Sequence, residues 1–152
     1  MHLDAIDRRI LRTLQRDGRM QNNDLARAVG LSPSPCLRRV RLLEEAGVIA
    51  RYVAVLDPAK IGKPLTLFAR IWLKAQDEDT IEHFMAEVIK LPEVLECYLM
   101  LGDCDAMVRV VAADIADYRR IQSEHLSRIK GVQNVKTDVP SQIIKQTSEL
   151  PL

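Results

Sequence analysis

The sequence has no apolar run long enough to cross a membrane, since no window approaches the roughly 18 uninterrupted apolar residues that a spanning helix needs. The first residues, Met1–Asp7, also lack the basic and apolar stretches of a secretory signal. Apolar residues make up 47% of the chain and charged residues 28%, which is typical of a globular protein. We therefore expect a cytoplasmic protein that has no membrane partner.

Cysteine is also scarce. The three cysteines, Cys36, Cys97 and Cys104, are odd in number, and none belongs to a Cys-x-x-Cys pair. A disulfide framework and a zinc ribbon both require paired or closely spaced cysteines, so we expect neither. The prediction is that these side chains act as small apolar residues and that the protein needs no metal and no cofactor.

The few histidines form no catalytic motif. His2 lies near the N-terminus, while His83 and His125 lie in segments that we predict to be helical, with no recognisable catalytic pattern around them. An enzyme needs a nucleophile or an acid–base pair held in a pocket. We therefore predict that the protein is not an enzyme.

The two signs of charge are unevenly distributed. Residues 1–51 contain ten arginines, no lysine and six acidic residues, a net charge of +4, whereas residues 52–152 carry a net charge of −3. A basic region made of arginine alone favours a polyanionic partner, because the guanidinium group matches phosphate and the edge of guanine. A solvated helix face would also account for this excess, so charge alone leaves both interpretations open.

Hydrophobic spacing predicts three short helices in the first fifty residues, at 4–17, 22–30 and 33–47. Gly30 terminates the second helix, and Pro33 occupies the first position of the third, where its missing N–H costs nothing. Two short helices joined by a tight turn that contains glycine are the helix-turn-helix plan. A three-helix bundle with a basic surface is the alternative.

The segment after the third helix changes its pattern. Residues 48–56 are β-branched and partly alternating, and the run stops at Asp57–Pro58. This pattern predicts one or two strands of a wing, then a linker that ends at Gly62–Pro64. We expect three parts: a helix-turn-helix domain at 1–50, a wing strand and linker at 51–64, and a second domain at 65–152.

The second domain is predicted to alternate strands and helices. The expected order is strand, helix, strand, strand, helix, strand, at residues 65–74, 77–91, 94–101, 106–112, 114–129 and 132–139, with a short fifth strand at 143–145. This order fits a split βαβ, ferredoxin-like sandwich, in which both helices cover one face of an antiparallel sheet. The strands at 65–74 and 94–101 are apolar on both sides, so we expect a second subunit to cover the other face.

RNA-recognition modules share this topology but stack bases on aromatic side chains of the sheet. The chain has only one Trp, three Tyr and two Phe, and the strand at 106–112 has none of these. The scarcity of aromatic side chains therefore argues against an RNA-binding sheet.

Several stretches of the chain carry a family signature. Residues 3–11 read LDAIDRRIL, residues 30–36 read GLSPSPC, and residues 94–97 and 102–105 read VLEC and GDCD. Together with the order of the elements, these stretches resemble the Lrp/AsnC family of leucine-responsive, or feast/famine, regulators. The resemblance covers almost the whole chain.

The resemblance implies an α+β fold, with an N-terminal (winged) helix-turn-helix followed by a ferredoxin-like βαββαβ domain. It also implies binding to double-stranded DNA by homodimers that usually gather into octamers. The helix-turn-helix would span residues 22–41 and would place its second helix in the major groove. The implied DNA contacts are Ser32, Ser34, Arg38, Arg39 and Arg41.

The resemblance further implies that a small amino acid, such as leucine or another aliphatic amino acid, binds between C-terminal domains. The implied effector-binding residues are Met100, Leu101, Gly102, Asp103, Cys104 and Asp105. Gly102 permits a tight turn, an aspartate suits an ammonium group, and Met100 and Leu101 suit an aliphatic side chain. An ordinary hairpin turn capped by aspartate is the alternative.

These patterns together predict a sequence-specific, nucleoid-associated transcription regulator that responds to an amino-acid effector. Its dimers are expected to place two third helices in successive major grooves, about 34 Å apart. The alternative is a ligand-independent architectural protein of the chromatin type. Such a protein would bind DNA widely, with steep salt dependence and little sequence preference.

Overall fold

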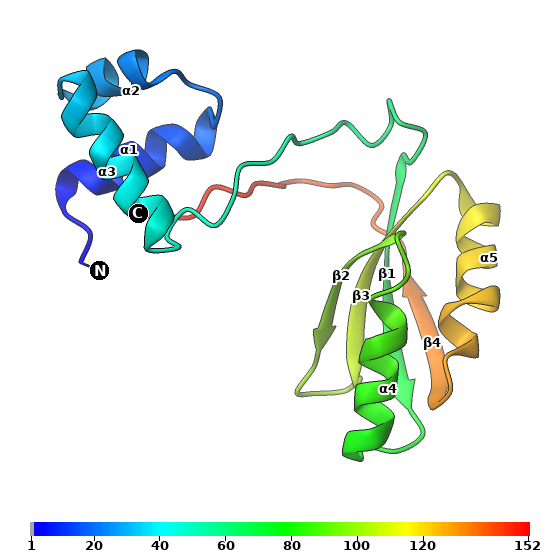
Figure 1. The fold of residues 1–152 in the computed structure, drawn as a ribbon. Helices are drawn as coiled ribbons and strands as arrows, with labels where there is room; N and C mark the ends of the chain where they lie inside the picture. The colour runs from blue at the N-terminus through cyan, green and yellow to red at the C-terminus, as the bar shows by residue number, and fades with distance from the viewer. Residues whose placement is uncertain (1) are drawn as a thin grey trace. The chain divides into compact units, whose positions relative to one another are not determined.

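The computed structural model describes residues 2–152, which form two compact units (Figure 1). One unit contains the residues up to Val55 together with residues 144–152, and the other contains residues 56–143. The second unit is therefore continuous in sequence, whereas the first is built from both ends of the chain. Among the described residues, every helix is too short or too polar to pass through a bilayer.

Three helices form the first unit, as the hydrophobic spacing predicted: α1 (Ala5–Arg16), α2 (Asn22–Val29) and α3 (Pro33–Glu45). A capping box starts α1. The Asp4 carboxylate accepts a hydrogen bond from the Asp7 amide at 2.8 Å, and the Asp7 carboxylate accepts one from the Asp4 amide at 3.1 Å. This reciprocal pair satisfies backbone donors that would otherwise have no partner in the first turn.

The turn between α2 and α3 fixes how these helices meet. Gly30 has a φ of 77°, a left-handed conformation that glycine adopts without steric cost, and it ends α2. Asn22, in the first turn of α2, donates its amide to the Pro33 carbonyl at 2.9 Å and so ties the starts of the two helices together. The buried apolar core of the unit consists of Ile10, Leu11, Leu25, Ala26, Val29, Cys36, Val40 and Leu43.

The segment after α3 differs from the prediction. Residues 51–57 form neither helix nor strand, and Val53 and Val55 are 66% and 86% exposed. Tyr52 instead donates its hydroxyl to the Glu44 carboxylate at 2.9 Å, which ties this segment to the end of α3. A strand needs a neighbour for its backbone N–H and C=O groups, and this chain by itself supplies none here. The strand predicted at 143–145 is absent for the same reason.

The second unit is a four-stranded sheet with two helices, and its fold class is the one predicted. The strands lie in the order β2-β3-β1-β4, and every neighbouring pair is antiparallel. The elements are β1 (Leu65–Leu73), α4 (Glu78–Val88), β2 (Val94–Leu99), β3 (Ala106–Ala112), α5 (Ile115–Glu124), a short 3-10 helix (Leu126–Arg128) and β4 (Val132–Asp138) (Figure 1).

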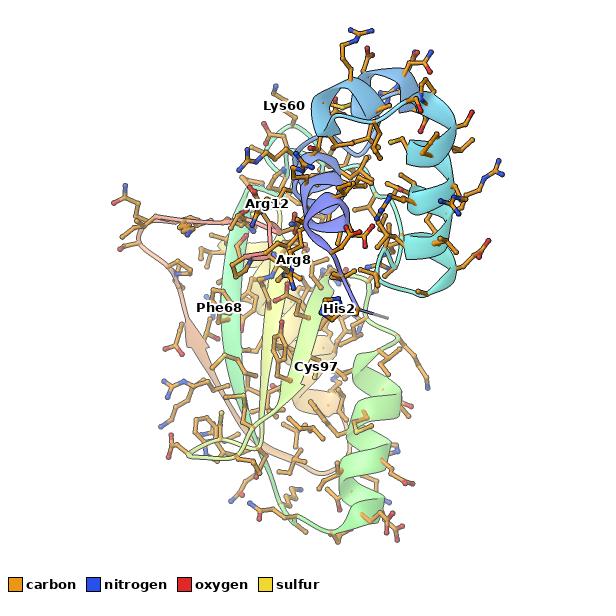
Figure 2. All side chains as sticks on the ribbon, turned by 90° about the vertical axis from the view of Figure 1, so that its left-hand side faces the viewer. His2, Arg8, Arg12, Lys60, Phe68 and Cys97 are labelled. Carbon is orange, nitrogen blue, oxygen red and sulfur yellow. The ribbon has the colours of Figure 1, made fainter. Side chains whose placement is uncertain are left out.

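Side chains alternate between the two faces of this sheet. On β1 one face carries Leu67 and Ile71, which are fully buried with Phe84 of α4 and Ile121 of α5. The other face carries Phe68, Arg70 and Trp72, which are only half-buried in a single chain (Phe68 is labelled on β1 in Figure 2). The helices therefore cover one face only, and the second face is left for other contacts.

Candidate DNA-binding surface and effector turn

The candidate DNA-binding surface is the exposed side of α3. Cys36, Val40 and Leu43 are the buried residues of this helix, so the opposite side faces solvent. A shallow depression of about 250 Å³ lies on that side. Its lining residues are Ser34, Leu37, Arg38, Arg41, Leu42 and Glu45.

Two of the predicted arginines are available to a partner. Arg38 and Arg41 are exposed, and neither forms an ion pair or a side-chain hydrogen bond with any residue between positions 2 and 152. Their guanidinium groups therefore keep all their donors for an external acceptor. A phosphate group or the O6 and N7 atoms of guanine match this donor geometry.

The start of α3 presents hydroxyl groups rather than a row of amides. Ser32 is the N-cap residue, yet its side chain makes no capping hydrogen bond. Pro33 and Pro35 lack N–H groups, so the first turn has fewer free backbone donors than an ordinary helix. The exposed hydroxyls of Ser32 and Ser34 are thus the main side-chain donors at this end for a phosphate oxygen.

Arg39 lies in a different environment from its neighbours on α3. Its guanidinium donates to the carboxylates of Asp4 and Asp7, both at 2.7 Å. Both hydrogen bonds raise the pKa of Arg39, and the one to Asp4 has the larger effect. The pKa of Asp4 is lowered, first by the hydrogen bond from the Asp7 amide and then by Arg39. The structure thus shows Arg39 joining α3 to α1, and its predicted DNA contact stays a prediction.

Sequence reasoning missed the role of Asn22. Gln21 is the N-cap of α2, whereas Asn22 lies inside the helix and uses its side-chain amide to hold Pro33. Its Oδ1 atom is buried and has no hydrogen-bond partner within the described part of the chain. No sequence signal marks this contact, because the two residues belong to different helices and the packing alone brings them together.

The predicted effector residues lie together in the turn between β2 and β3. The Met100 amide donates to the Asp105 carbonyl at 2.9 Å, which closes the turn. The Asp105 amide donates to the Ile71 carbonyl at 2.9 Å, which pins the turn to β1. Leu101 is fully exposed, whereas Cys104 is buried.

The two aspartates of the turn have different roles. The Asp105 carboxylate accepts hydrogen bonds from the Leu73 amide at 2.7 Å and from the Gln76 side chain at 2.8 Å, so it is occupied within the unit. The Asp103 side chain is 84% exposed, and its nearest cation is Arg70 at 3.9 Å. Asp103 is therefore the aspartate of this turn whose carboxylate is available to a cationic ligand.

Gly102 has an ordinary backbone conformation in this turn. The φ of Gly102 lies outside the left-handed region, and an added Cβ would meet no atom within 4 Å. Neither observation requires glycine at this position, and the predicted role of Gly102 in the turn stays a prediction. The turn is instead held by Asp105 and by Trp72, whose indole N–H donates to the Asp103 carbonyl at 2.6 Å.

Over the described range, residues 2–152, His, Cys, Asp and Glu side chains do not gather in groups of three or more that would hold a metal ion.

An N-terminal helix-turn-helix followed by a ferredoxin-like sheet unit is the arrangement of a two-domain DNA-binding protein. Two family models match the chain in this arrangement. Residues 3–50 match the winged helix-turn-helix DNA-binding model, and residues 66–150 match the Lrp/AsnC ligand binding domain. The chain belongs to the Lrp/AsnC family, as its sequence motifs predicted.

Characterised relatives agree with this assignment. The leucine-responsive regulatory protein of Haemophilus influenzae is 43% identical over 150 residues, which cover 99% of this chain and 90% of the relative. The protein of the same name from Escherichia coli K12 is 43% identical over 148 residues, which cover 97% and 90%. Together with the DNA-binding family model matched at residues 3–50 and the AsnC family transcriptional regulators among similar structures, these relatives show that the chain is a DNA-binding transcription regulator and not an enzyme.

Solved structures agree as well. A transcriptional regulator from Neisseria meningitidis, crystallised as a complex with L-Met, has a TM-score of 0.95 and 37% identity, covering 99% of this chain and 97% of that one. An AsnC family regulator from Agrobacterium tumefaciens has a TM-score of 0.93 and 41% identity, covering 98% and 97%. The comparisons of sequence and of structure therefore agree on the fold and the family.

Proposed function

We propose that the protein is a sequence-specific transcription regulator that reads duplex DNA with the exposed side of α3. The observation that carries this proposal is the pair of unengaged arginines, Arg38 and Arg41, beside the depression on that side. Each guanidinium group can donate two parallel hydrogen bonds to a guanine in the major groove. Ser32 and Ser34 at the start of the helix suit the flanking phosphates.

Arg39 holds the helix that carries this surface in place. By bridging to Asp4 and Asp7 it holds α3 against α1, which keeps the orientation of the reading side constant. A recognition helix must arrive at the groove in a fixed orientation for its base contacts to discriminate between sequences. We therefore propose that Arg39 contributes mainly through the position of α3.

We also propose that a small amino acid binds beside the turn at 100–105. The exposed Asp103 carboxylate suits an ammonium group, and Arg70, 3.9 Å away, suits a carboxylate. Met100 and Leu101 offer apolar surface for an aliphatic side chain. The Neisseria meningitidis relative was crystallised with L-Met, so L-Met and leucine are the first effectors to test.

Assembly is part of the proposal. The uncovered face of the sheet carries Phe68 and Trp72, and residues 51–57 carry exposed β-branched side chains without a strand partner. A second copy of the chain would bury the uncovered sheet face and would give residues 51–57 a strand to pair with. We therefore propose a homodimer that gathers into an octamer. A protein of this kind acts on the chromosome, and we propose a cytoplasmic, nucleoid-associated location.

Genome-wide DNA capture tests the DNA-binding and effector proposals together. We expect a limited set of enriched sites whose occupancy changes on addition of L-Met or leucine. The matched control for an Arg38→Ala variant is Arg27→Ala, since Arg27 is exposed on α2 but pairs with Asp24. Uniform coverage of the genome that no amino acid alters would instead favour the architectural alternative.

Sedimentation velocity tests the assembly. We expect the purified chain to sediment as a dimer or as a multiple of dimers at micromolar concentration. A charged residue on the uncovered face, as in Phe68→Glu, should shift the population toward smaller species. A monomer at every concentration would contradict the proposed assembly.

A further inference from the structure

The end of the chain is attached to the first helix of the DNA-binding unit. The Leu150 amide donates to the Gln15 side-chain oxygen at 2.6 Å, and the Gln15 side-chain amide donates to the Leu150 carbonyl at 3.1 Å. Arg16 donates to the Glu149 carboxylate at 3.0 Å. These contacts belong to one compact unit, because residues 144–152 cluster with the residues up to Val55.

Further contacts extend the attachment along α1. Arg12, one turn of α1 after Arg8 (both labelled in Figure 2), donates to the main-chain oxygen of Leu152. The Leu152 side chain packs against the apolar core of the three helices. The segment therefore uses both hydrogen bonds and apolar contact.

Exposed groups make up much of the attachment. The side chains of Arg16 and Glu149 are 72% and 36% exposed, and exposed ion pairs contribute little to stability. Residues 141–152 form no helix or strand, and Ile144 is 92% exposed, so few contacts hold the approach to α1. Segments with such low contact density open locally far more readily than the core.

The other end of this segment is held in the sheet unit. It begins after Asp138, the last residue of β4, and Arg70 binds the Asp138 carboxylate through two hydrogen bonds, at 2.7 and 3.3 Å. The same guanidinium lies 3.9 Å from Asp103 in the turn at 100–105. Arg70 thus contacts both the candidate effector turn and the point where the segment leaves the sheet.

We propose that residues 139–152 form a detachable strap, held at its start by Arg70 and at its end by α1, which links the state of the turn at 100–105 to the DNA-binding unit. A ligand carboxylate that recruits Arg70 competes with Asp138 for its donors. The end of β4 is then freer, the strap is effectively longer, and the local concentration of its end at α1 falls. Only the regulatory output rests on the proposed effector site; the strap itself does not.

Reversing the charges of the Arg16–Glu149 pair tests the attachment at α1. The readout is hydrogen exchange at the Leu150 amide in the full-length protein, followed by NMR. Arg16→Glu and Glu149→Arg should each speed exchange by up to about five-fold, and the double variant should restore the original rate. A Leu150 amide that exchanges in the unaltered protein as fast as in a free peptide would overturn the strap.

Arg70→Gln tests the link between the two ends. Without any ligand, this change should speed exchange at the Leu150 amide by about 1.5- to 2-fold, because the strap lengthens. Arg109→Gln is the matched control, since Arg109 pairs with Glu96 at 2.7 Å in the same sheet but does not touch the strap. Equal rates in the Arg70→Gln variant and the unaltered protein would refute the link.

Calorimetry with L-Met and leucine separates this inference from the proposed function. Absence of heat with the unaltered protein would refute those effectors and leave the strap measurements as they stand. Heat with the unaltered protein, combined with a ligand-induced change at Leu150 that Arg70→Gln abolishes, is the expected result. A ligand-induced change of full size in Arg70→Gln would overturn the role of Arg70.

Discussion

Arginines on the exposed side of α3 and three arginines of the sheet unit differ in what they contact. In the sheet unit Arg70, Arg109 and Arg120 are each paired with a carboxylate of the same unit, at 2.7, 2.7 and 2.9 Å. On the exposed side of α3, Arg38 and Arg41 have no such partner among the described residues. A paired arginine has its charge compensated by a carboxylate of the same unit. The unpaired arginines on one face of α3 have no such compensation, so their charge is available to a polyanion.

The same contrast appears within α3 itself. Arg38 and Arg39 are adjacent in sequence, yet Arg38 faces solvent and Arg39 bridges two carboxylates of the α1 capping region. Neighbouring positions on a helix point about 100° apart, so a single step along α3 separates the reading side from the packing side. Replacing Arg38 should therefore affect DNA binding, whereas replacing Arg39 should affect stability.

Replacement of Arg38 should have the largest effect on function. Arg38→Ala removes a free guanidinium from the reading side, so we expect operator affinity to fall by about 1–3 kcal/mol. Thermal stability should change little, because the side chain has no partner in the protein. Fluorescence anisotropy with a captured operator measures the affinity, and unchanged binding would remove Arg38 from the reading side.

Replacement of Arg39 should instead reduce stability. Arg39→Ala leaves the buried Asp7 carboxylate without its cation, so we expect the free energy of unfolding to fall by about 1–2 kcal/mol, reduced from the value for a fully buried pair by solvent screening. Urea denaturation of the full-length protein measures this change. Unchanged stability of Arg39→Ala, together with a loss of DNA affinity like that of Arg38→Ala, would show that both arginines contact DNA. That result would contradict a positioning role for Arg39.

The two aspartates of the turn offer a similar test in the sheet unit. Asp105→Asn weakens the acceptor of the Leu73 amide, so we expect the free energy of unfolding to fall by about 1 kcal/mol. Asp103→Asn should leave stability nearly unchanged and weaken binding of the amino-acid effector. Denaturation of both variants measures the free energy of unfolding, and calorimetry measures binding of the effector. The reverse pattern would show that the occupied carboxylate, Asp105, is the one that binds.

The smallest expected effect concerns alkaline pH. Burial, followed by the hydrogen bond to Glu44, raises the pKa of Tyr52 to about 12 from its ordinary value of 10.0. The unfolded chain therefore loses this proton at lower pH than the folded protein does. The contribution to stability is complete below pH 10 and is lost as the pH rises toward 12.

A comparison with Tyr52→Phe isolates this contribution. The variant should lose less stability than the unaltered protein between pH 10 and pH 12, since its ring carries no proton to release. Difference absorbance of the tyrosinate during the same titration reports when the hydroxyl ionises. A tyrosinate signal for Tyr52 that appears at pH 10 would show that its contact with Glu44 is absent in solution.

Much of the fold could be predicted because its signals are local. The spacing of Ile10, Leu11 and Leu14 was enough to predict a helix at 4–17, which the structure shows as α1. The strands of the sheet unit were recognised from runs of alternating or β-branched residues. The position of Arg38 and Arg41 on the exposed side of α3 follows from the same helical period.

Features that depend on a distant partner could not be predicted. The wing strand was expected from the β-branched residues 48–56, but a single chain offers that segment no strand to pair with. Asp103 and Asp105 looked equivalent, and only the approach of Leu73 and Gln76 distinguishes them. The attachment of Glu149 and Leu150 to α1 leaves no periodic signal in the sequence at all.

The family, the fold class and the helix that carries the candidate DNA contacts could be predicted from the sequence, because periodicity and motifs lie in adjacent residues. Tertiary structure alone decided that Arg39 is engaged by two carboxylates, that Asp103 rather than Asp105 is open, and that the chain's last residues return to its first helix. The physical reason is that the availability of a charged group depends on which groups packing brings within hydrogen-bonding distance, and packing joins residues far apart in the chain.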